Sequence, residues 1–208
     1  PLDWEIASYD HSAWRHEIDR AVLHLPSSRV DVSLGRQAIG WGRGMLFGAV
    51  DLFSPFSPFE VDREWRRGVD AVRVDARLSS RSSTDVVLAF GERMDESAYA
   101  VRLRGYTGEV DVEAVGGWRA GDAFGGAATS FVLGQAEVHG ELAVFDTPAV
   151  SGSSLFGDPR TIVKAVVGGS SRVPVGAGLV IYVEYHYSGF GVPAATDLVA
   201  ALFDAEFV

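Results

Sequence analysis

Residues 29–78 read RVDVSLGRQAIGWGRGMLFGAVDLFSPFSPFEVDREWRRGVDAVRVDARL, and this stretch decides the fold. Polar and apolar side chains alternate over 29–38 and again over 69–78, which is the two-residue period of a half-buried β-strand. The connection between these strands contains GWGRG (40–44) and DLFSPFSPFEVDREWRRG (51–68). It is too long for a hairpin turn and too rich in Phe, Trp and Arg for a solvated linker, so we expect it to be functional.

Bulk composition limits the classes of protein that this chain can represent. With 208 residues it is long enough for one large β-domain, and we interpret residues 1–208 as a single domain. Its net charge of −10 argues against a nucleic-acid partner, which requires a basic face. The absence of Cys excludes disulfides and thiolate metal sites. No apolar run is long enough for a membrane-spanning helix.

The remaining sequence reads as a succession of short strands joined by turns. We predict strands at 2–9, 18–25, 29–38, 69–78, 84–91, 97–104, 109–118, 122–132, 136–145, 161–169 and 177–188, and one short helix at 197–207. Such a series, about 10–12 strands joined sequentially, predicts an all-β fold in which an antiparallel sheet runs up and down.

The lengths of the connections alternate along this meander. Short turns such as SSRSS (79–83), GYTG (105–108) and LGQ (133–135) occupy every second connection after Pro26. The long connections 40–68 and 146–160, and the tail after Ser188, all fall in the other set. Alternate connections lie at the same end of a meander, so one end has only short turns and the other has the long loops. Transmembrane β-barrels of the bacterial outer membrane are built in this way.

The alternation also separates charged side chains from apolar ones. One face of the strands mixes Arg with carboxylates, whereas the other carries Val, Leu and Ala with aromatic residues near strand ends. A soluble barrel would turn the apolar face inward, and a membrane barrel would turn it outward to lipid. The scarcity of Lys and amides favours a confined polar lumen over a soluble surface. The aromatic residues that we assign to a lipid-interface girdle are Tyr99, Tyr106, Trp118, Phe145, Tyr185 and Tyr187.

Three ordered motifs carry a resemblance to a known class of proteins. They are GRQAIGWGRG (35–44), DLFSPFSPFE (51–60) and REWRRGVDAVRV (63–74). In this order they resemble porin-type outer-membrane β-barrel proteins of Gram-negative bacteria. The resemblance implies a transmembrane barrel in the outer membrane that contacts lipid, and such barrels often form homo-oligomers. Proteins of that class begin with a signal peptide and end on an aromatic residue, so we expect this chain to be truncated at both ends.

Catalytic and metal sites find little support in the sequence. His139 and His186 share the charged face with several Glu residues, but no HxxH or HExxH spacing is present, so we interpret them as polar wall residues. Ser151, Ser153 and Ser154 lie in a Gly-rich loop without a nucleophile-elbow pattern. We therefore expect neither an enzyme nor a cofactor.

The sequence thus favours a porin-like channel that passes small solutes or ions by diffusion through a charged lumen. Two alternatives stay open, which are a plugged barrel acting in binding or assembly and a soluble ligand-binding barrel. Small inward residues at Ala71, Ala98, Ala100, Gly117 and Gly178 favour an open interior over a plug. The 40–68 loop either enters the lumen, forms an outer lid or packs at the barrel mouth. The predicted lumen residues are Arg63, Arg66, Arg67, Arg73, Asp75, Arg77, Arg102, Arg104, Asp111, Glu113, Glu137, Glu141 and Glu184.

Overall fold

The computed structural model describes residues 3–9, 12–51, 53, 68–91, 93–146, 161–176 and 178–190. These residues confirm the all-β prediction. The strands are β1 (Asp3–Tyr9), β2 (Ser12–Glu17), β3 (Ala21–Leu25), β4 (Val30–Gln37), β5 (Val69–Arg77), β6 (Ser82–Ala89), β7 (Ala98–Thr107), β8 (Val110–Arg119), β9 (Asp122–Leu133), β10 (Ala136–Asp146), β11 (Thr161–Val173) and β12 (Leu179–Ser188). One short 3-10 helix, η1 (Met94–Glu96), lies between β6 and β7. Within the described ranges, no helix has the length and hydropathy to span a membrane.

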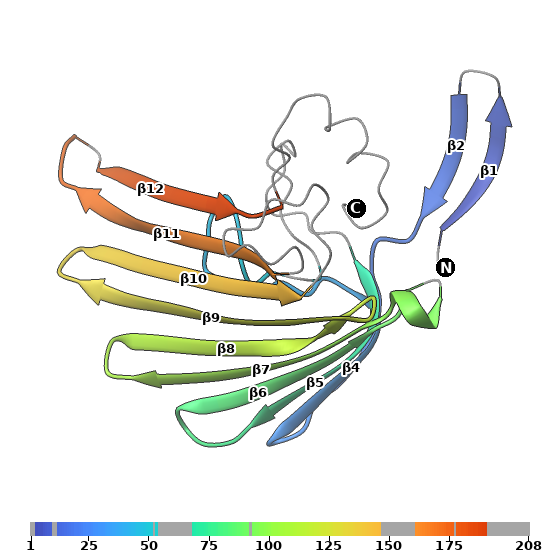
Figure 1. The fold of residues 1–208 in the computed structure, drawn as a ribbon, viewed down its shortest axis with the longest axis horizontal. Helices are drawn as coiled ribbons and strands as arrows, with labels where there is room; N and C mark the ends of the chain where they lie inside the picture. The colour runs from blue at the N-terminus through green and yellow to red at the C-terminus, as the bar shows by residue number, and fades with distance from the viewer. Residues whose placement is uncertain are drawn as a thin grey trace.

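Ten of the strands form one antiparallel up-and-down sheet, as the sequence predicts. Each strand from β4 to β11 pairs with the strand before it and the strand after it in the chain, β3 pairs with β4, and β12 pairs with β11. Figure 1 shows the strong curvature of this sheet. The sheet is not closed, because β3 and β12 form its two edges. Strands β1 and β2 form a separate hairpin, which stands apart from the sheet in Figure 1.

Several strand boundaries differ from the sequence prediction for local reasons. β2 was not predicted, and β3 begins at Ala21 rather than at residue 18. β7 and β9 run further than predicted, since the turns that follow them contain only two residues. Gly108 and Gly134 open these turns at φ values of 60° and 66°, which suit two-residue hairpins. The helix predicted at 197–207 lies outside the described residues.

The predicted alternation of connection lengths is confirmed. Tight turns join β5 to β6, β7 to β8, β9 to β10 and β11 to β12, and they gather at one end of the sheet in Figure 1. The connections from β4 to β5 and from β10 to β11 are the long ones, and both start at the opposite end. A two-residue turn, Ala120–Gly121, also joins β8 to β9 at that opposite end.

The two faces of the sheet have opposite chemistry. The inner face, which we define as the one covered by residues 39–51, holds a row in which Asp75, Asp85 and Arg102 are cross-strand partners. The outer face holds a row in which Val74, Val86 and Val101 are partners. Outer-face side chains with at least 37% of their surface exposed include Leu23, Leu88, Tyr99, Val101, Leu103, Val112, Trp118, Leu142, Val144, Val167, Ile181, Val183 and Tyr185. Apolar side chains are thus exposed while charged ones lie on the covered face.

Two residues of the predicted aromatic girdle lie on the inner face instead. Phe145 pairs across strands with Phe124 and Ile162, both of which are buried. Phe145 follows Glu141 by four residues in β10, and side chains an even number of residues apart in a strand point to the same face. Tyr106 is the cross-strand partner of Asp111, since β7 continues past the predicted end of that strand. Tyr99 and Trp118 are outer-face partners near the long-loop end, in agreement with the prediction.

Candidate functional site

An inner strap, which we define as residues 39–51, lies across the inner face of the sheet. Ile39, Trp41, Ala49 and Val50 are fully or almost fully buried. They form one core with small inward side chains of the sheet, which include Ala71, Ala98, Ala100, Ala128 and Ala143. The small residues that predict an open interior therefore make room for the strap over this part of the wall. Gly178 lies outside the strand wall, in the turn before β12.

The packing of the strap on the sheet also requires a glycine at position 126. A Cβ built on Gly126 of β9 would lie 3.0 Å from Cγ1 of Val50 and 2.7 Å from the carbonyl oxygen of Leu142. The first distance shows that the Val50 side chain of the strap packs directly on the sheet at Gly126, and the second reflects the close approach of β9 and β10. The strap thus fits a wall whose side chains are small where it passes.

An arginine cluster on β5–β8 is organised around two buried carboxylates, Asp85 and Glu113. Arg73 binds Asp85 in a bidentate manner, with Nε 2.9 Å from Oδ1 and Nη2 2.7 Å from Oδ2. Arg102 bridges the two carboxylates, since its Nη2 lies 3.0 Å from Asp85 and its Nη1 lies 3.4 Å from Glu113. Arg104 donates from Nε to Glu113 over 3.2 Å. Only 2% of either carboxylate side chain is exposed, so both charges depend on these partners.

The strap completes this cluster with two of its own side chains. Arg43 donates from Nη2 to Glu113 over 2.7 Å and also forms an ion pair with Asp111. Burial alone lowers the pKa of Arg43, but the hydrogen bonds and charges of Asp111 and Glu113 outweigh it and raise the pKa, so the guanidinium stays charged. The indole Nε1 of Trp41 lies 3.3 Å from Asp85, and the guanidinium of Arg102 sits 5.4 Å from the Trp41 ring centroid.

A carboxylate clamp on β10 and β12, formed by Glu141 and Glu184, holds the strap by its backbone. Glu141 accepts hydrogen bonds from N–H groups at both ends of a tight loop. At one end, Oε1 accepts from Arg43 and, over 2.7 Å, from Gly44. At the other end, Oε2 accepts from Ala49 over 2.6 Å and from Val50 over 3.2 Å. One carboxylate therefore closes the base of the loop.

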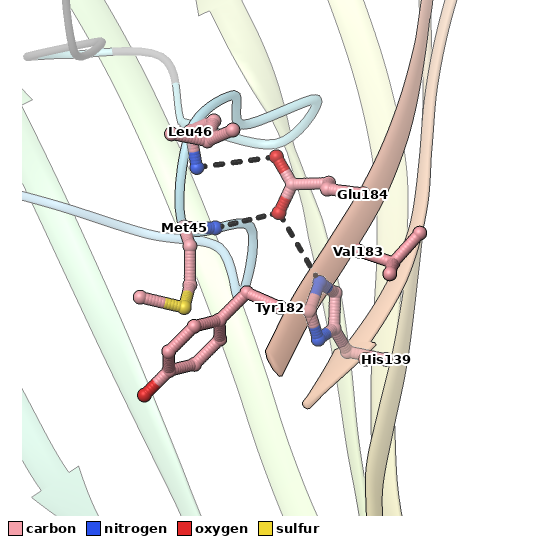
Figure 2. A pocket seen from close by; sticks show the side chains of 7 residues that line it. Met45, Leu46, His139, Tyr182, Val183 and Glu184 are labelled. Carbon is pink, nitrogen blue, oxygen red and sulfur yellow. Dashed lines mark hydrogen bonds and ion pairs between the residues drawn. The ribbon is translucent and has the colours of Figure 1, made fainter. Parts of the chain in front are cut away.

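Glu184 accepts from the tip of the same loop (Figure 2). Its Oε2 lies 2.7 Å from the N–H nitrogen of Met45, and its Oε1 lies 3.1 Å from that of Leu46 and 3.0 Å from that of Phe47. His139 approaches the same carboxylate, with Nε2 3.3 Å from Oε2 of Glu184. Figure 2 shows Glu184 between the strap and His139, beside a small pocket that Met45, Leu46 and Tyr182 line. Consecutive N–H groups that converge on an anion are a known device for binding negative charge.

The sequence GWGRG supplies the backbone freedom that the loop requires. Gly42 has a φ of 113°, a region that residues with a side chain rarely adopt. A Cβ on Gly42 would also lie 2.9 Å from Oε1 of Glu141. A Cβ on Gly44 would lie 1.7 Å from the carbonyl oxygen of Phe47. Glycine at both positions lets the backbone turn tightly around the Glu141 carboxylate.

The structure brings many of the predicted lumen residues together. Arg73, Arg102, Arg104, Asp111 and Glu113 meet in the arginine cluster. Glu141 and Glu184 form the clamp. The other described ones, Asp75, Arg77 and Glu137, share the inner face but lie at the margin of these groups; Arg77 approaches Asp31 only to 3.9 Å. Arg63, Arg66 and Arg67 lie outside the described residues.

Sequence reasoning missed three contributors to the site. Asp85 was not selected, although its position in the alternating strand TDVVLAF (84–90) places it opposite Val86 and on the charged face. Arg43 and Trp41 belong to the long connection, whose conformation no alternation could predict. The backbone N–H groups of 43–50 carry no sequence signal beyond the glycines. The described residues contain no group of three or more His, Asp or Glu that could hold a metal.

Comparison of the chain with protein-family models, with curated proteins and with solved structures yields no match.

Proposed function

We propose that this chain is an outer-membrane β-barrel protein that passes small solutes or ions through a charged interior. The observation that carries the proposal is the inverted distribution of side chains. Leu103 and Trp118 on the outer face are 52% and 58% exposed, whereas Asp85 and Glu113 are buried on the inner face. In water an apolar surface of this extent is unfavourable, and in a bilayer it is what lipid requires.

The interior chemistry supports a channel wall. Charged side chains of the inner face are fixed in pairs by hydrogen bonds, and partly exposed guanidiniums such as Arg73 and Arg104 lie at the edge of the cluster. Charged groups held in place along a narrow passage select solutes by charge at short range. Because a sheet edge in hydrocarbon would leave backbone groups unpaired, the proposal requires that β3 and β12 are paired in the membrane.

The strap supports a second candidate, a plugged barrel that acts in binding or assembly. Its buried residues fill the inner face over β5–β11 instead of leaving it open. The two candidates agree on the membrane location and differ only in whether a path remains beside the strap.

One experiment separates these functions. The chain is expressed with an export signal in a Gram-negative host, the outer-membrane fraction is isolated, and the purified protein is inserted into a planar bilayer. We expect partition into the membrane fraction and discrete conductance steps. A chain that remains dissolved without detergent would contradict the membrane location. A chain that inserts without any conductance would leave the plugged barrel.

A further inference from the structure

We propose that Glu141 and Glu184 are positioning residues that hold the inner strap against the wall and thereby set the width of the pore. This inference deepens the proposed channel function and rests on it. Glu141 lies on β10 and Glu184 on β12, so the clamp reaches across three neighbouring strands. The part of the strap between its two contacts with Glu141 is the part that Glu184 holds.

The clamp differs from ordinary loop packing because it uses the strap's main chain. Four N–H groups converge on Glu141 and three on Glu184. An ionised carboxylate is a pure acceptor and can receive all of these bonds at once. Hydrogen bonds to a charged acceptor are about twice as strong as neutral ones. The strap conformation therefore depends on two negative charges supplied by distant strands.

Side-chain contacts of the loop tip are weaker by comparison. Met45 and Leu46 are 44% and 38% exposed, so little apolar burial holds them down. Phe47 stacks on His186, with ring centroids 4.6 Å apart. The side chains of Trp41 and Arg43 also anchor the start of the strap to Asp85 and Glu113, which do not belong to the clamp. Ala49 and Val50 are also held by burial in the core. Loss of the clamp should therefore free the tip at residues 44–48 and make residues 49–50 open more often, while the start of the strap stays in place.

Glutamine is the substitution that tests the charge with the least change of shape. In Glu141→Gln one oxygen is replaced by an NH₂ group, which faces backbone N–H donors and cannot accept from them. The same holds for Glu184→Gln at the loop tip. Glu137→Gln is the matched control, because Glu137 lies on β10 and the same face but its described ion-pair contact is with His139. Circular dichroism checks that each variant keeps its sheet.

Strap release is measured without reference to conduction. The chain has no Cys, so Val50→Cys introduces a unique thiol at a side chain that is fully buried. Thiol labelling by a membrane-impermeant maleimide is followed in protein reconstituted in vesicles. We expect labelling to accelerate about tenfold or more with Glu141→Gln or Glu184→Gln, since a hydrogen bond to a charged group contributes at least that factor. Glu137→Gln should leave the rate unchanged.

Single-channel recording then tests the effect on the pore. Both clamp variants should show larger or more variable conductance steps than the Glu137→Gln control. A disulfide between Phe47→Cys and His186→Cys, added to the Glu184→Gln variant, should restore the smaller step until it is reduced.

The two readouts separate the ways in which the proposal can fail. Unchanged labelling in both clamp variants would overturn the holding role of Glu141 and Glu184. Faster labelling with unchanged conductance would overturn the link between the strap and pore width. A wild-type chain that inserts but never conducts would overturn the proposed channel and, with it, the pore-width role; labelling would still decide whether the clamp holds the strap.

Discussion

The two faces of the ten-stranded sheet differ in which side chains are buried, although the same strands form both. On the outer face, Val101 and Leu103 of β7 expose much of their apolar surface, whereas on the inner face Arg102, the residue between them, is buried with its charge paired. One strand therefore alternates between two environments over successive residues. The comparison teaches that burial in this protein does not follow hydrophobicity.

The cost of the inner face explains how it is organised. A buried charge is unfavourable unless hydrogen bonds from partners replace those of water. Asp85 and Glu113 receive them from arginine side chains, and Glu141 receives them from the strap backbone. The inner face thus depends on specific partners, whereas the outer face depends on the solvent that surrounds it. A substitution on the inner face should therefore change stability through the partners that it loses, and one on the outer face through its transfer between water and the bilayer.

The largest effect is expected when a buried acceptor of the inner face is removed. Asp85→Ala leaves the guanidiniums of Arg73 and Arg102 without their shared carboxylate and the indole of Trp41 without its acceptor. Breaking one member of a buried ion pair costs about 3–5 kcal/mol. Urea unfolding of protein reconstituted in vesicles, followed by tryptophan fluorescence, measures this loss. A loss below 1 kcal/mol would show that water replaces the carboxylate and that the cluster is not a buried network.

A charge placed on the outer face tests the other half of the comparison. Leu103→Arg should destabilise the protein by about 2–4 kcal/mol in a bilayer, the range for Arg at the midplane of a membrane strand. The physical reason is that the guanidinium would have to leave water for hydrocarbon. The same urea titration measures it, with Glu109→Arg in the β7–β8 turn as a control that should have little effect. A stabilising or neutral effect of Leu103→Arg would indicate that this face meets water.

The assignment of most side chains to the inner or outer face could be predicted from the alternation of polar and apolar residues. The conformation of the strap could not. The pattern of β5 and β7 assigns Arg73 and Arg102 to one face without any knowledge of their partners, because the period of two is a property of the strand itself. The prediction placed Phe145 in the outer girdle because it is aromatic, and this was wrong. Its even spacing from Glu141 in β10 already indicates the inner face. The strap contacts depend on glycine torsions and on carboxylates that lie far away in sequence, 97 residues for Gly44 and Glu141 and 139 for Met45 and Glu184, which no local pattern contains. Asp85 shows that a charged residue in an alternating strand should be assigned by parity before composition.

A smaller effect is expected in the strap, where the inner face is completed by backbone. Gly42→Ala introduces a side chain at a φ of 113° and beside the Glu141 carboxylate. Such strained positions cost about 1–3 kcal/mol. Gly178→Ala is the matched control, because its φ is 99° and a Cβ there would meet no atom within 4 Å. Urea titration of both variants should rank Gly42→Ala as the more destabilising. Equal losses would mean that only backbone torsion matters and that the contact with Glu141 is unimportant.

The smallest effect is expected for a charge at the margin of the inner face. The side chain of Arg77 is 61% exposed and approaches Asp31 only to 3.9 Å, so water already solvates the guanidinium. Exposed pairs of this kind contribute about 0–1 kcal/mol, and Arg77→Ala should lie in that range when measured beside Asp85→Ala. Its effect should also shrink in high salt, because exposed charges are screened, whereas the loss caused by Asp85→Ala should persist. A large, salt-independent loss for Arg77→Ala would mean that Arg77 is covered as tightly as the arginine cluster. The inner face would then be uniformly buried, and the difference in burial would lie only between the inner and outer faces.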